Sequence, residues 1–180
     1  MARRREKRDK SGYTGNEVQV VTFNLGRETY GVKVTEVREI VKLENITRVP
    51  RTQSFIEGVM NLRGQITTVV DLRRLMAVAD ASPGGAQNRI IVAEIGDSQM
   101  GLLVDSVQDV MRIAPESILP PPRAVSEQAA ARYLSGICRL PDRLVLLLDV
   151  CRILGGEELG RAAETARTAP APPGRAGVAD

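Results

Sequence analysis

The feature of this sequence that most restricts its fold is an internal repeat, in which the second half of the chain copies the apolar pattern of the first. At an offset of seventy residues, Leu25-Gly26 aligns with Ile95-Gly96. Further along, the offset becomes seventy-eight, and residues 55–59 align with residues 133–137. The matching glycines fall at expected hairpins, where a residue without a Cβ is useful. The repeat therefore predicts a duplicated fold of two similar units.

Within each copy, short segments of alternating or continuous apolar residues predict β-strands. Val18 to Leu25 alternates, and Gly26-Arg27-Glu28 then turns the chain into a second strand over residues 29–34. Further strands are expected over residues 66–70, 88–95, 99–104 and 144–148. Within residues 35–41 the apolar spacing is three and four instead, which predicts a helical turn.

Asp71 and Asp149 follow apolar strands at the same place in the two copies. Aspartate is a favourable helix N-cap because its carboxylate accepts a hydrogen bond from a free backbone N–H of the first turn. We therefore predict a short helix after each strand, and we interpret both carboxylates as caps rather than as catalytic acids.

The size of the repeat predicts how the chain is organised. Each copy has about seventy residues and about five short strands, which is too little for a substantial core, so we expect two small five-stranded β-barrels packed against each other. We assign residues 17–84 to the first barrel and 85–156 to the second. The polar or Pro/Ala-rich segments 1–16 and 157–180 are expected to be disordered tails.

The charge distribution bears on nucleic-acid binding. Residues 1–16 hold six basic and two acidic side chains, whereas residues 17–156 hold sixteen of each. A dedicated nucleic-acid binder would carry a basic face on the fold itself. No nucleic-acid partner is therefore expected, and an arm-mediated nucleic-acid-associated protein is kept as the alternative function.

The composition argues against an enzyme. The chain contains no histidine, and no catalytic or phosphate-binding motif is present. Cys138 and Cys151 are too few and too widely separated for a zinc site, and we expect two buried thiols, with a disulfide as the alternative. No catalytic, cofactor or metal site is predicted. No apolar run is long enough to insert into a membrane, and no signal peptide is evident, so a cytoplasmic location is expected.

One hairpin tip differs between the copies. The first copy has Asn61-Leu62-Arg63-Gly64-Gln65, and the second has Arg139-Leu140-Pro141-Asp142-Arg143. Both are consistent with simple turns. Because arginine is enriched at binding hot spots, the alternative is that Arg63 is displayed for a partner.

Residues 55–73, which contain Asn-Leu-Arg-Gly followed by an apolar strand and Asp-Leu-Arg, resemble the signature of CheW-like chemotaxis coupling proteins. Segments 30–40 and 100–107 add to the resemblance, which covers about residues 17–156. One departure is Thr68, where the family usually has proline, and only a small local change is expected there.

The resemblance implies two SH3-like five-stranded barrels and a non-enzymatic adaptor in two-component signal transduction. Its implied partners are chemoreceptor cytoplasmic tips and the regulatory domain of the histidine kinase CheA, in arrays at the inner face of the membrane. By resemblance, the receptor and kinase interaction residues are Val37, Glu39, Gly58, Arg63 and Val107. Val37 and Val107 are also equivalent positions of the repeat, so core and interface remain equal alternatives for them.

Overall fold

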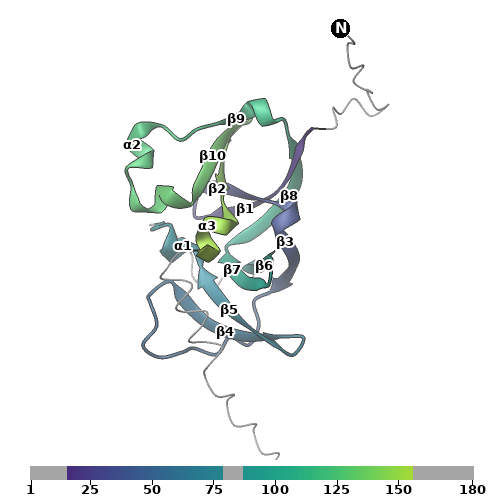
Figure 1. The fold of residues 1–180 in the computed structure, drawn as a ribbon, viewed down its shortest axis with the longest axis vertical. Coiled ribbons are helices and arrows are strands. Elements are labelled where there is room, and N and C mark those ends of the chain that lie inside the picture. Colours follow the sequence, from purple (N-terminus) through teal and green to yellow (C-terminus); the bar gives the residue numbers. More distant parts are fainter. Residues whose placement is uncertain (1–15, 79–86, 156–180) are drawn as a thin grey trace, which may run out of the picture.

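The segments predicted to be strands form two sheets in the computed structural model of the chain, which describes residues 16–78 and 87–155 (Figure 1). The five-stranded sheet contains, in spatial order, β3 (Val37–Lys42), β6 (Arg89–Ile95), β7 (Ser98–Val104), β5 (Gln65–Asp71) and β4 (Ile56–Leu62). The six-stranded sheet contains β8 (Ser106–Ile113), β1 (Val18–Leu25), β2 (Glu28–Lys33), β11 (Leu144–Leu148), β10 (Leu134–Arg139) and the two-residue β9 (Ile118–Leu119). The helices are short: η1 (Val34–Glu36), α1 (Leu72–Leu75), η2 (Pro115–Ser117), α2 (Arg123–Ser126), η3 (Ala129–Tyr133) and α3 (Val150–Gly155). The predicted mainly β fold is confirmed.

Each copy of the repeat contributes its first hairpin to the sheet of the other copy. The β1–β2 hairpin lies between β8 and β11, and the β6–β7 hairpin lies between β3 and β5. Both insertions use the same geometry, an antiparallel contact on one side (β1 with β8, β3 with β6) and a parallel contact on the other (β2 with β11, β7 with β5). The shared pairing pattern supports the duplication inferred from the sequence.

This exchange of hairpins differs from the expected organisation into contiguous halves. The boundary between residues 84 and 85 separates the two copies, but strands from both sides of it enter each sheet. Residues 17–84 and 85–156 therefore do not each supply one whole sheet. The physical reason is that both first hairpins carry the same apolar pattern, and only the folded chain decides which sheet each one joins. The expected tails lie almost entirely outside the described residues.

The largest buried cluster is shared between the sheets. It contains Phe23 and Tyr30 of the six-stranded sheet together with Val70 and Leu102 of the five-stranded sheet. Two smaller clusters, each with five buried residues, are formed within one sheet alone. Because most of the apolar burial lies between the sheets, neither unit keeps its core without the other. The expectation that two marginal units pack together is confirmed.

Local structure follows the sequence at the two predicted caps. The Asp71 carboxylate accepts a hydrogen bond from the Arg73 backbone N–H at 3.0 Å, and the Asp149 carboxylate accepts one from that of Arg152 at 3.2 Å. Both helices predicted after the strands are present. The helical turn predicted within residues 35–41 is wrong over most of its length, since only η1 is helical and β3 follows as a strand of alternating burial. Pairing with β6 outweighs the local apolar spacing there.

A buried ionic network joins the two units at the point where the chain passes from β7 to β8. The Arg73 guanidinium, on a side chain only 6% exposed, donates to both oxygens of Asp71 at 2.9 and 3.0 Å and to Asp105 at 3.0 Å. Asp105 also accepts from the backbone N–H of Gly26, in the β1–β2 turn of the other sheet, at 2.7 Å. The side-chain hydrogen bond to Asp71 is the main cause that raises the pKa of Arg73, with smaller Coulombic contributions from both carboxylates.

Candidate functional site

The β4–β5 hairpin ends in a two-residue turn that holds Arg63 in an unusual backbone conformation. Leu62 pairs with Gln65, and both central residues have positive φ, 52° at Arg63 and 83° at Gly64. Positive values at both positions define a type I′ turn, in which Asn, Asp or Gly is preferred at the first position. A left-handed conformation costs a residue with a Cβ about 1–2 kcal/mol. Arginine is therefore energetically unfavourable at this turn position, and its presence there needs an explanation other than the turn itself.

The side chain of Arg63 points into solvent and is held by one ion pair. Its Nη2 lies 3.1 Å from Oε2 of Glu39, and the two side chains are 74% and 19% exposed. The pair connects the tip of the β4–β5 hairpin to β3, and β3 and β4 are the two edge strands of this sheet. An exposed ion pair contributes about 0–1 kcal/mol, so a partner could replace Glu39 at little cost. The structure thus brings together two of the five predicted site residues, Glu39 and Arg63.

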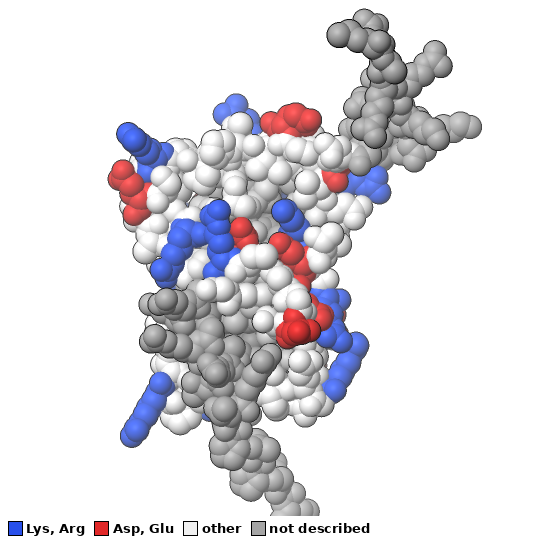
Figure 2. Space-filling model, viewed as in Figure 1, with Lys and Arg blue, Asp and Glu red and all other residues white. Residues whose placement is uncertain are grey.

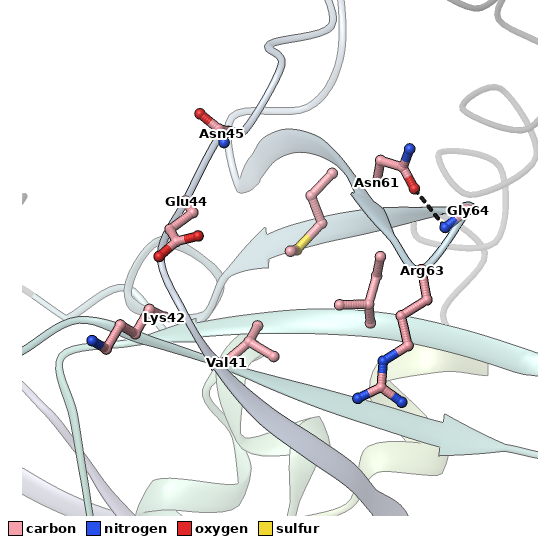
Figure 3. Close-up of a pocket in the computed structure, with 9 residues that line it drawn as sticks. Val41, Lys42, Glu44, Asn45, Asn61, Arg63 and Gly64 are labelled. Atoms are coloured by element: carbon pink, nitrogen blue, oxygen red, sulfur yellow. Dashed lines mark hydrogen bonds between the residues drawn. The ribbon is translucent and has the colours of Figure 1, made fainter.

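A surface groove of about 710 Å³ lies beside this ion pair, between the end of β3 and the tip of β4 (Figure 3). Apolar side chains of Val41, Met60 and Leu62 line it, with Lys42 and Arg63 adding positive charge. The remaining lining residues are Glu44, Asn45, Asn61 and Gly64. Such a groove can accept apolar side chains of a partner, while the charged groups select its orientation. The sequence repeat gives no signal for it, because the groove forms between strands that are separated along the chain.

Val37 and Val107 do not line the groove. Both are half-buried and pack against the large shared cluster, and they occupy equivalent places at the starts of β3 and β8. Opposite them across the ladders lie Ala93 and Phe23, which are fully buried. Their packing explains both valines as framework residues, and their role at an interface stays a prediction.

Gly58 has a structural reason to be glycine. Its φ is +151°, and a Cβ built there would lie 2.2 Å from the backbone oxygen of Thr47. The backbones meet at this point because Thr47 and Val59 exchange two hydrogen bonds of 2.8 Å. Gly58 therefore lets the segment after β3 approach β4, which brings both walls of the groove together.

Replacement of Gly58 by alanine is expected to lower the free energy of unfolding by at least about 1 kcal/mol, because the added Cβ collides with backbone and the conformation is unfavourable. Urea unfolding followed by circular dichroism measures the change. Gly155→Ala is the matched control, since no atom of the described residues lies within 4 Å of a Cβ at that position. Equal stability of the Gly58→Ala variant and the wild type would contradict this role.

The two cysteines differ in environment and are not joined by a disulfide. Cys138 is buried, as predicted, and burial raises the pKa of its thiol. Cys151 is exposed, so the prediction of two buried thiols is wrong for it; it lies on the outer side of α3. Its sulfur lies near carboxylate oxygens of Glu36 and Asp149, with the three ligand atoms within 4.8 Å of one another. Burial is the main cause that raises the pKa of Glu36, and Asp149 adds to it.

No helix in the described ranges 16–78 and 87–155 is long and apolar enough to cross a membrane.

Comparison with known proteins identifies the family. The family model described as the CheW-like domain matches residues 19–158. Chemotaxis protein CheW of Klebsiella aerogenes is 36% identical over 141 residues, 78% of this chain and 84% of that protein. Protein FrzA of Myxococcus xanthus is 35% identical over 140 residues, 77% of this chain and 86% of that protein.

The solved structures agree with the sequence comparison. The crystal structure of the scaffolding protein TtCheW from Thermoanaerobacter tengcongensis matches with a TM-score of 0.68 and 36% identity, over 74% of this chain and 85% of that one. The two sheets described above therefore correspond to the two SH3-like β units that the resemblance implied. With its family model, its relatives and its fold in agreement, this chain belongs to the CheW-like family.

Proposed function

We propose that this protein is a non-enzymatic scaffold that couples chemoreceptor cytoplasmic tips to the regulatory domain of the histidine kinase CheA, at receptor arrays on the inner face of the membrane. Family membership supports a chemotaxis role, since the relatives are named as chemotaxis proteins and the solved relative as a scaffolding protein. The observation that carries the proposal is Arg63, an exposed cation on a strained turn beside an apolar groove.

The geometry supports binding by exchange of an ion pair. Arg63 is held by Glu39 in the free protein, and a carboxylate on a partner can take the place of Glu39. The apolar groove then buries side chains of the same partner, and this burial supplies most of the binding energy. The equivalent tip of the other unit has Pro141 and Asp142 in place of Arg63 and Gly64, so the two units present different surfaces. A coupling protein needs this difference in order to hold two partners at once.

The alternative function, nucleic-acid association, rests on the basic segment 1–16, most of which lies outside the described residues. On the face shown in Figure 2, basic and acidic side chains lie in small mixed groups separated by uncharged surface. A nucleic-acid site on the folded body would require a continuous basic stripe.

The test is a pull-down with the purified full-length protein, a receptor cytoplasmic fragment and CheA. We expect both partners to be retained in moderate salt, and CheA autophosphorylation to change only when receptor and this protein are both present. Binding to nucleic acid through the basic arm would instead weaken by orders of magnitude as salt rises. Retention of neither partner, together with salt-sensitive nucleic-acid binding, would replace the scaffold by the alternative.

A further inference from the structure

The tip that carries Arg63 is built differently from the other two-residue hairpin tips. In the β1–β2 and β6–β7 turns the first central residue is glycine, Gly26 with φ 61° and Gly96 with φ 58°. In the β4–β5 turn the order is reversed, and Arg63 takes the first place while glycine takes the second. Both central positions of this turn have positive φ, and the first is occupied by a residue with a Cβ and a long side chain, so an additional contact must hold it there.

A side chain next to the turn provides this support. The side-chain Oδ1 of Asn61 accepts a hydrogen bond from the backbone N–H of Gly64 at 2.8 Å, across the turn (Figure 3). In Figure 3 the side chains of Asn61 and Arg63 extend on opposite sides of the tip. Asn61 therefore does not touch the guanidinium, and its hydrogen bond acts on the backbone that positions Arg63, although the residue also lines the groove. At the equivalent place in the other copy stands Arg139, which has no acceptor.

We propose that Asn61 is a positioning residue, whose hydrogen bond to Gly64 holds Arg63 in the left-handed conformation that places its guanidinium at the rim of the groove. The link to partner binding rests on the proposed function, whereas the claim that Asn61 holds the backbone of Arg63 does not. Asn61 is exposed and lies outside the three buried clusters, so its loss leaves the core intact. Without the bond, the unfavourable φ of Arg63 is no longer offset, and the turn samples conformations that point the side chain elsewhere.

The test compares four variants of the full-length protein: Asn61→Ala, Asn61→Asp, Arg63→Ala and the matched control Arg139→Ala. Nuclear magnetic resonance measures the Arg63 HN–Hα coupling, which reports φ, and the hydrogen-exchange protection of the Gly64 amide. Affinity is measured with a receptor cytoplasmic fragment and CheA. Asn61→Ala is expected to lose Gly64 protection, shift the Arg63 coupling and weaken binding about three- to tenfold, the value of one hydrogen bond. Asn61→Asp keeps an acceptor oxygen and should restore all three values, and Arg139→Ala should change none.

The outcomes separate the inference from the proposed function. Unchanged coupling and exchange in Asn61→Ala would overturn the positioning role, whatever the binding result. A loosened turn with normal binding, while Arg63→Ala binds weakly, would overturn the link between the turn and recognition. Normal binding by Arg63→Ala would exclude the proposed interaction site and, with it, the role of Asn61 in recognition. The coupling and exchange measurements would still decide whether Asn61 holds the backbone conformation of Arg63. Because aspartate keeps both the size and the acceptor oxygen of Asn61, failure of Asn61→Asp to restore the turn would overturn the claim that this accepted hydrogen bond holds it.

Discussion

Replacement of Arg73 by alanine is expected to lower the free energy of unfolding by about 3–5 kcal/mol, the cost of leaving buried charge without its partner. Arg73 binds both oxygens of Asp71, which is 2% exposed, and also binds Asp105. Its removal leaves the buried Asp71 carboxylate with only the longer ion pair to the half-exposed Arg74, at 3.6 Å. It also weakens the contact between α1 and the junction of the two sheets. Guanidinium chloride unfolding followed by circular dichroism at neutral pH measures the loss.

Two further variants test the cause of that loss. Arg38→Ala removes an ion pair to Glu94 whose side chains are 44% and 40% exposed, and it should change stability by no more than about 1 kcal/mol. Adding Asp71→Asn to Arg73→Ala removes the buried charge that has lost its main partner and should recover part of the lost stability. If Arg73→Ala unfolds at the wild-type denaturant concentration, the network does not stabilise the fold and the argument from burial is wrong.

Replacement of Arg63 by alanine is expected to leave the fold unchanged and to weaken binding of the receptor fragment, alone or with CheA, by at least about tenfold. A hot-spot arginine contributes about 2 kcal/mol or more to binding, whereas an exposed substitution usually changes stability within about 0.5 kcal/mol. Alanine keeps the Cβ and with it the cost of the positive φ at position 63, so only the exposed ion pair to Glu39 is lost, which keeps the stability change small. Isothermal titration and thermal unfolding measure the two effects separately.

Arg143→Ala is the matched control, because Arg143 lies in the equivalent tip of the other unit and is expected to affect binding far less. Wild-type affinity in Arg63→Ala would exclude this tip from the interaction site. A large loss of stability would instead show that the Arg63–Glu39 pair holds the hairpin against β3 and is part of the framework.

Local features of the fold could be predicted from the sequence because their causes are local. Alternation predicted β1 with its observed limits, and the apolar run at residues 144–148 predicted β11. Asp71 and Asp149 predicted two helix starts, since a cap depends on a hydrogen bond within a few residues. The segment 35–41 shows the limit of this approach. Its spacing favours a helix, but β6 offers a ladder partner about fifty residues away, and that pairing decides its structure.

The candidate site could likewise be predicted only in part from the sequence. Arg63 could be singled out because one tip differs between two otherwise similar copies, and a difference of this kind is visible in the sequence. The Glu39 contact, the groove and the support from Asn61 were not predicted, since each depends on distances across the folded sheet. For Gly58, the structure adds that a close approach of two backbones requires glycine at that position.

The sequence by itself determined that this protein is a duplicated, mainly β chain, and its motifs pointed to the family, because periodicity and repeats are properties of residue order. Only the tertiary structure decided which hairpin joins which sheet. The β1–β2 and β6–β7 hairpins have matching apolar faces, so their patterns fit either sheet, and the choice rests on non-local packing. The resulting exchange places most of the buried apolar surface between the units. The ion pair of Arg73 with Asp105 also joins the two units. Two barrels whose separate cores are marginal therefore form one cooperative fold.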